Sequence, residues 1–170
     1  MMTESESESE SESETESERT GTFLVTAADG ESAVLKDVHS GQVHALSSNP
    51  GVSEDEAVRG TVAPDPPMNV SWQLVEVDSR WTVSVERSTE SPTTNSRDIA
   101  ADNPDGELVR EERAGTGEIH VLSVPDDMTE QAVDDVLSDR EGLLSRAARL
   151  DVNRVEVRSQ PGVVAVRYMP

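Results

Sequence analysis

Apolar and polar residues alternate in short runs between residues 21 and 86. The first run, Gly21 to Ala27, ends at Asp29-Gly30, and later runs break at glycine, proline, asparagine or aspartate. A period of two is typical of half-buried β-strands. Five or six such strands without a long helix predict a small closed β-barrel over residues 21–86.

A different rhythm follows this segment. Residues 87–96 contain no apolar side chain except one proline, which is typical of a linker. Residues 97–170 then show two strand patterns, two amphipathic helix patterns and two further strands, with a short helix expected at Arg97–Ala101. The order ββααββ predicts a small α+β domain at 97–170.

The loop at Ser40-Gly41 is predicted to be a two-residue hairpin turn. In that register Asp37 and His44 are direct cross-strand neighbours. A carboxylate beside an imidazole raises the pKa of the imidazole and fixes its tautomer, as a general base requires. Such pairs more often only stabilise a surface, and neither a nucleophile nor a second acid accompanies this one. We therefore predict no catalytic residue and no enzyme.

A second hairpin is predicted around Asp78-Ser79, and its turn length decides where Trp72 points. A two-residue turn places Trp72 on the same face as Trp81. A three-residue turn places it on the opposite, more exposed face, where it would serve as a stacking platform for a base. The sequence leaves both registers open.

The N-terminal segment is acidic throughout. Residues 3–18 alternate Glu with Ser or Thr and contain no apolar side chain. Such a segment cannot bury enough surface to offset its ordering entropy, so residues 1–20 are predicted to be a disordered tail. A solubility role, phosphorylation and docking on a basic site are all open for it.

The charge balance indicates adaptation to salt. The chain carries 35 acidic and 14 basic residues, a net charge of -21, and Lys36 is its one lysine. In dilute salt this charge strains a compact state, whereas at about 1 M ionic strength the Debye length is about 3 Å. We therefore predict a halophilic protein of a high-salt cytoplasm, with a core of Val, Leu and Ala because aromatic residues are scarce.

Several classes of function are excluded by what the sequence lacks. Without cysteine there is no disulfide, thiolate zinc site or thiol nucleophile. No apolar run approaches the 18 residues of a membrane span, and the N-terminus lacks the apolar region of a signal peptide. The three histidines do not have metal-ligand spacing on one element, and no glycine-rich phosphate loop occurs. We expect no metal, cofactor or membrane partner.

Arginines concentrate near the C-terminal end, where residues 140–170 hold six arginines and three acidic residues. A basic patch there would bind phosphate, an acidic partner or the acidic tail of the chain. The alternative is that these arginines pair with neighbouring carboxylates. The predicted patch consists of Arg146, Arg149, Arg154 and Arg158.

Short motifs in the first half carry a family resemblance. Gly41-Gln-Val-His-Ala-Leu-Ser47 resembles a stretch of the OB-fold RNA-binding domains repeated in the largest small-subunit ribosomal protein of bacteria, and Gly60-Thr-Val62 follows as in that pattern. The resemblance covers residues 21–86. It implies an OB-like barrel whose RNA-binding face includes Phe23, Lys36 and His44. The chain departs from the pattern because only Lys36 and Arg59 would supply positive charge there.

The whole chain also resembles a haloarchaeal family of unknown function. The shared segments are Gly21-Thr-Phe-Leu-Val-Thr, Pro64-x-Pro-Pro-Met68, Arg97-Asp-Ile-Ala-Ala and Gly117-Glu-Ile-His-Val-Leu. This resemblance agrees with the high-salt interpretation and implies no activity.

The sequence thus predicts a non-catalytic binding module. RNA or single-stranded nucleic acid is the first candidate ligand, held by Phe23, Lys36, His44, Arg59 and Trp72. The alternative is a protein–protein adaptor acting through the α+β domain at 97–170. An enzyme using Asp37 and His44 is a third alternative.

Overall fold

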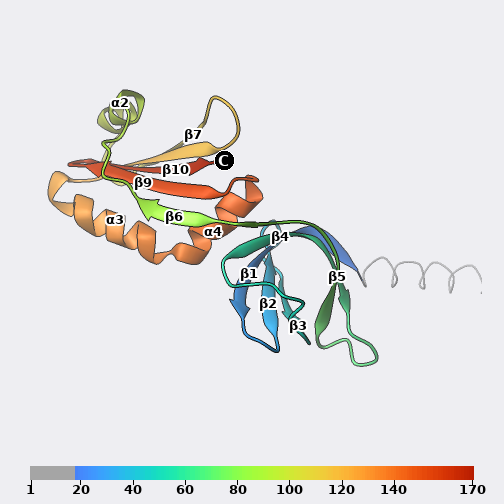
Figure 1. Cartoon of the computed structure of the whole chain (residues 1–170). Helices are drawn as coiled ribbons and strands as arrows, with labels where there is room; N and C mark the ends of the chain where they lie inside the picture. Colours follow the sequence, from blue (N-terminus) through green and yellow to red (C-terminus); the bar gives the residue numbers. More distant parts are fainter. Residues whose placement is uncertain (1–17) are drawn as a thin grey trace, which may run out of the picture. The chain divides into compact units, whose positions relative to one another are not determined.

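The computed structural model describes residues 18–170, which form two compact units that meet between Trp81 and Thr82 (Figure 1). Most of the regular structure is β, in two sheets, and the described residues include three α-helices. The predicted tail, residues 1–20, lies outside the described part except for its last three residues. The first strand begins at Arg19, so residues 19 and 20 belong to a strand.

Five strands build the sheet of the first unit. In chain order they are β1 (Arg19–Ala28), β2 (Ala33–Asp37), β3 (Val43–Leu46), β4 (Glu56–Pro64) and β5 (Trp72–Thr82). The sheet runs in the order β1-β2-β3-β5-β4 and closes on itself, because β1 pairs with both β2 and β4. β3 and β5 are parallel, while β1 is antiparallel to both of its neighbours.

The interior of this unit is built from the alternating apolar positions. Aliphatic side chains dominate it, as the scarcity of aromatic residues requires, and Trp72 and Leu74 pack against its edge. The buried members are Phe23, Val25, Ala33, Leu35, Leu46, Val52, Val58 and Val62. The prediction of a core built mainly from small aliphatic residues agrees with this cluster, to which Phe23 is added.

The turn between β2 and β3 is longer than predicted. It comprises residues 38–41, because the Asp37 carboxylate accepts hydrogen bonds from two amides within the turn at 2.8 and 3.0 Å. Such an Asx-type turn stabilises a four-residue loop. Leu35 rather than Asp37 lies opposite His44, so the predicted Asp37–His44 pair is wrong.

The predicted hairpin at Asp78-Ser79 is also wrong, because β5 runs without a break from Trp72 to Thr82. Arg80 is tied at this point to residues outside β5. Its guanidinium contacts Glu56 at 2.8 Å and the carbonyl of Gly51 at 2.9 Å. In a continuous strand the tryptophans at positions 72 and 81 point to opposite faces.

Residues after β5 belong to the second unit rather than to the barrel or the linker predicted for them. Strand β6 (Ser84–Arg87) pairs in parallel with β9 (Arg154–Gln160), placing Val85 opposite Val155. Helix α2 (Thr94–Asp102) starts inside the predicted linker, where Thr93 caps it by accepting from the Ser96 amide at 3.2 Å.

The second sheet has five strands in the order β6-β9-β10-β8-β7. Its remaining elements are β7 (Leu108–Glu112), β8 (Glu118–Ser123), the short 3₁₀ helix η1 (Asp126–Met128), α3 (Thr129–Ser138), α4 (Arg140–Arg149) and β10 (Val163–Met169). The predicted ββααββ order omits β6. Helix α2 packs on β8 and β10, whereas α3 and α4 pack on β9, β10 and β6 from the other face (Figure 1).

Close packing of β4 against β5 depends on one glycine. A Cβ atom at Gly60 would lie well inside van der Waals contact of the backbone carbonyl of Glu76. A backbone carbonyl cannot move aside as the end of a flexible side chain can. The two strands therefore approach this closely only because Gly60 has no side chain.

We predict that Gly60→Ala lowers the free energy of unfolding of the first unit by about 1–3 kcal/mol, the usual cost of overpacking. Both tryptophans lie in this unit's β5, so their fluorescence in a denaturant titration reports its unfolding. Gly30→Ala is the matched control, because a Cβ atom at Gly30 meets nothing within 4 Å. Equal stability of the two variants would contradict the close approach of β4 and β5.

Candidate functional site

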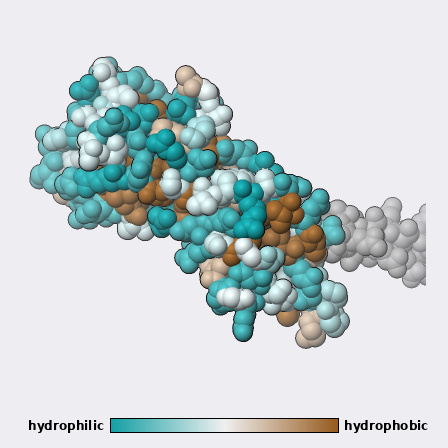
Figure 2. Space-filling view, in the orientation of Figure 1, coloured by the Kyte–Doolittle hydropathy of each residue, from teal (hydrophilic) through white to brown (hydrophobic). Residues whose placement is uncertain are grey.

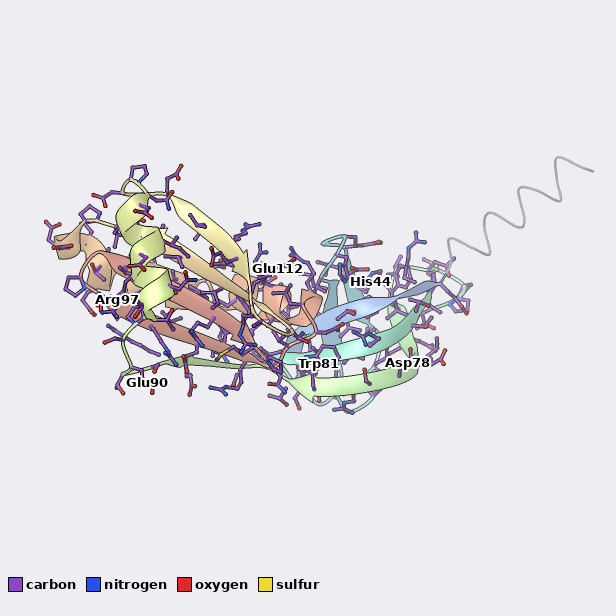
Figure 3. The ribbon with its side chains drawn as sticks, turned by 90° about the horizontal axis from the view of Figure 1, so that it is seen from above. His44, Asp78, Trp81, Glu90, Arg97 and Glu112 are labelled. Carbon is purple, nitrogen blue, oxygen red and sulfur yellow. The ribbon has the colours of Figure 1, made fainter. Side chains whose placement is uncertain are left out.

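Two of the residues predicted to bind RNA lie in the interior of the first unit. Phe23 is 0% exposed and His44 is 1% exposed. The His44 ring contacts Phe23 and Trp72 edge-on, with centroid distances of 5.7 and 4.3 Å, and Figure 3 shows it among the strands of this unit. These two rings are therefore not available for stacking on a base.

The other predicted residues do not complete a single face. Lys36 pairs with Leu24 and Val43, and alternation along β2 places its side chain on the face opposite to that of Leu35, which belongs to the interior cluster. Arg59 lies 5.7 Å from the centroid of the Trp81 ring. Phe23, His44 and Trp72 thus point inward while Lys36 and Arg59 do not, and Trp72 is half-buried.

The His44 imidazole is an uncharged member of the core. Both of its ring nitrogens are buried without a hydrogen-bond partner. Burial lowers the pKa of His44, and Arg19 adds to this effect while Asp37 opposes it. A neutral ring packs there at less cost than a charged one, whose desolvation would not be compensated.

The four arginines of the predicted basic patch do not share one face. Arg154 and Arg158 lie on β9, on the side of the sheet that α2 covers in part, whereas Arg146 and Arg149 lie on α4, which packs on the opposite side. Their separation follows from the sheet between them.

Arg154 and Arg158 instead surround a buried carboxylate. Glu156 is 6% exposed and contacts Arg158, with Arg154 at 3.5 Å and Arg167 at 3.4 Å. Arg158 also reaches Glu90 at 2.8 Å, in the segment after β6 that Figure 3 labels. These arginines are ion-paired, as the alternative interpretation of the patch expected.

An apolar groove opens on the other face of the second sheet, and we call it the β7 groove. It has a volume of about 350 Å³ and lies where α3 and α4 leave β8 and β7 uncovered. Strands β7, β8 and β10 provide its floor, and the two helices provide its wall. The residues that line it are Leu108, His120, Leu122, Ala132, Asp135, Val136, Asp139, Leu143, Val166 and Tyr168.

The two polar rings on the groove floor, His120 and Tyr168, are uncharged near neutral pH. Glu118 Oε1 lies 2.9 Å from His120 Nε2, and the His120 and Tyr168 rings are 4.9 Å apart. Burial lowers the pKa of His120, although Glu118 opposes this, and burial raises the pKa of Tyr168. Because a carboxylate only accepts hydrogen bonds, the His120 proton sits on Nε2.

The groove combines apolar surface with a few polar groups. Glu118 and His120 resemble the base and orienting group of a general-base pair. The groove also offers shape, apolar surface and hydrogen bonds to a ligand.

Beside the groove, β7 forms an open edge of the sheet. The Arg113 amide donates to Gly117 at 3.2 Å and the Ser123 amide donates to Glu107 at 3.0 Å, which fixes the odd-numbered residues of β7 as those bonded to β8. The backbone N–H and C=O groups of Leu108, Arg110 and Glu112 consequently point away from the sheet. β7 has no strand on that side within the described residues.

A second exposed apolar surface lies on the first unit. Val75 and Val77, on β5, are 53% and 46% exposed. Figure 2 shows hydrophobic atoms at the surface in the region where Figure 1 draws β4 and β5.

Comparison with known families assigns the chain to one. A family model described as "Family of unknown function (DUF5812)" matches residues 19–159, a span that includes strands of both units. The chain belongs to the DUF5812 family. Neither the curated proteins nor the solved structures include a match. Within the described part of the DUF5812 chain, no helix has the length and apolarity to cross a membrane.

Sequence reasoning missed the groove because its residues come from five elements of the DUF5812 chain. One signal was present: Glu118, His120 and Leu122 alternate on β8, within a segment that the sequence comparison had already singled out. The pattern showed that these residues share a face. It did not show that the helices leave this face uncovered.

We predict that His44 makes the first unit sensitive to acid. The folded-state pKa of His44 lies below its ordinary value of about 6.5, so its contribution to stability is complete above that pH and is lost as the pH falls. Between the unfolded and folded pKa values the loss is at most about 1.4 kcal/mol per pH unit. His44→Leu removes this contribution. Denaturant titrations followed by tryptophan fluorescence, at pH values from about 8 to about 5, measure the free energy of unfolding of both proteins. Parallel pH profiles for the two proteins would contradict the assignment.

We also predict that Glu156→Gln destabilises the second unit, because it removes the buried counter-charge of the partly buried Arg158 and Arg167 guanidinium groups. The expected loss is about 3 kcal/mol in a denaturant titration followed by circular dichroism. Glu130→Gln is the control, because it breaks an exposed pair with Arg87 and should change little. An equally small loss in both variants would show that the buried pairs do not stabilise the sheet.

Proposed function

We propose that the DUF5812 chain is a non-catalytic protein–protein adaptor that binds an extended segment of a partner in the β7 groove. One observation carries this proposal: an unpaired edge strand directly borders an apolar groove. In strand addition, backbone hydrogen bonds at an edge supply affinity, while a neighbouring pocket reads alternate side chains. The second unit contains both parts in adjacent positions.

The register of β7 suits this mode. Leu108 lines the groove and is 48% exposed, and alternation places the Arg110 and Glu112 side chains on the same face. Their backbone groups point to the open edge. A strand added there would extend the sheet and direct every second side chain toward the groove.

Apolar contact would supply much of the affinity. Leu108 and Leu122 lie opposite each other on β7 and β8, and both line the groove. Burying apolar surface is worth about 25 cal/mol per Å². An anchoring side chain on these leucines would therefore add to the main-chain hydrogen bonds of the edge.

Nucleic-acid binding through the first unit is a second proposal. Its support is the closed five-stranded order, which is consistent with an OB-like barrel, and the outward Arg59 beside Trp81. The inward positions of Phe23 and His44 and the net charge of -21 weaken it. The acidic composition also supports our proposal that the chain works in a high-salt cytoplasm.

The adaptor proposal is tested by blocking the edge without disturbing the sheet. The probe is a fluorescein-labelled peptide, Thr-Val-Thr-Leu-Thr-Val-Thr, followed by fluorescence anisotropy with the full chain. Arg110→Pro removes an N–H group that points outward and keeps the pairing with β8, so binding should weaken at least about tenfold. Arg110→Ala, which keeps the N–H group, should stay within about twofold.

Two results would overturn the proposal. One is equal binding of the peptide by Arg110→Pro and the unmodified chain. The other is no peptide binding, together with binding of a labelled single-stranded RNA that Arg59→Ala abolishes, which would favour the nucleic-acid proposal.

A further inference from the structure

The β7 groove joins an apolar channel to a negative rim. Asp135 and Asp139 are the two formally charged residues among the ten that line it. They lie four positions apart at the end of α3, where side chains at this spacing are neighbours. The Asp135 carboxylate accepts from Gln131 at 2.9 Å, and the Asp139 carboxylate accepts from the Gly142 amide at 3.3 Å. A carboxylate has about four acceptor sites, so both can accept further hydrogen bonds.

Two helix termini meet at this rim. Helix α3 ends at Ser138 with Asp139 as its C-terminal cap, and the Asp139 side chain also caps the N-terminus of α4. The partial negative charge of the first terminus is offset by the partial positive charge of the second. The negative character of the rim therefore comes from the two carboxylates.

We propose that the partner segment inserts a lysine or arginine side chain into the β7 groove, an inference that rests on the adaptor function proposed above. Its aliphatic stem packs on Leu108, Leu122 and Val136, and its charged head reaches Asp135 and Asp139. Long basic side chains bury their stems on apolar surface in this way while the head stays in a polar environment. The groove supplies an apolar surface for the stem and two carboxylates for the head.

Other anchors fit the groove less well. A purely apolar anchor would desolvate the two carboxylates without pairing them, which costs free energy. An acidic anchor would meet the two like charges of Asp135 and Asp139 at contact distance and would be repelled.

Charges of both signs act on the rings of the groove floor. Besides the larger effect of burial, Arg110 and Arg146 act to lower the pKa of His120 and Tyr168, while Glu118 acts to raise both. The formally charged residues that line the groove, Asp135 and Asp139, are both negative. A basic head group therefore finds its counter-charge at these two carboxylates.

The test varies the central residue of the labelled peptide used above. Lysine, arginine, norleucine and glutamate versions are titrated by fluorescence anisotropy at a KCl concentration where circular dichroism shows the chain folded. Lysine and arginine should bind about five- to tenfold tighter than norleucine, and glutamate should bind weakest. Asparagine replaces aspartate without loss of helix capping, so the double variant Asp135→Asn, Asp139→Asn should abolish this preference.

Asp134→Asn is the matched control. It removes the same charge from the same helix at a position that does not line the groove, so it should leave the preference intact. A preference that disappears equally in Asp134→Asn would reflect net charge alone and would overturn the inference.

The failures of the two proposals are distinguishable. If all four peptides bind equally and Arg110→Pro still abolishes binding, the adaptor function stands and the basic anchor is wrong. If no peptide binds, both proposals are wrong. Concentration-dependent dimers in sedimentation, lost in Arg110→Pro, would assign the edge to a second copy of the chain and overturn the basic-anchor inference.

Discussion

The second unit is governed by a mismatch between the widths of helices and strands. A helix with its side chains is about 10 Å across, whereas neighbouring strands are about 4.8 Å apart, so one helix covers about two strands. Two helices therefore cannot cover a five-stranded sheet on one face. Helices α3 and α4 pack on β6, β9 and β10, and the uncovered remainder at β8 and β7 becomes the groove. The candidate site exists because the two helices are too narrow to cover all five strands.

The first unit faces a different constraint, because the chain has few large side chains to fill a closed sheet. Phe23, Trp72 and His44 meet edge-on where aliphatic residues alone would leave space. Burying His44 costs free energy, because both of its ring nitrogens lose their hydrogen bonds to water. The unit gains volume at the cost of a polar group in its core, and residues that looked like a binding surface serve the interior instead.

Local patterns allowed much of the fold to be predicted from the sequence. Alternation indicated the strands of the first unit, and changes of period indicated the helices and strands of the second half, whereas Phe23 was assigned to a binding face and lies in the core. The errors arose where distant partners or single hydrogen bonds decide. Hydrogen bonds to the Asp37 carboxylate make the turn between β2 and β3 longer than predicted. Strand β6 was predicted to belong to the barrel, but it pairs with β9 in the second sheet. The groove was beyond prediction because it depends on which strands the helices leave bare.

The protonation of the groove floor has a consequence for anything that enters it. With the pKa of His120 lowered and that of Tyr168 raised, neither ring carries charge across the neutral range. The His120 and Tyr168 rings therefore keep the same protonation state, and the same hydrogen-bonding capacity, when the pH changes within this range. Among the lining residues, a side chain that enters the groove therefore meets formal charge only at the carboxylates of Asp135 and Asp139.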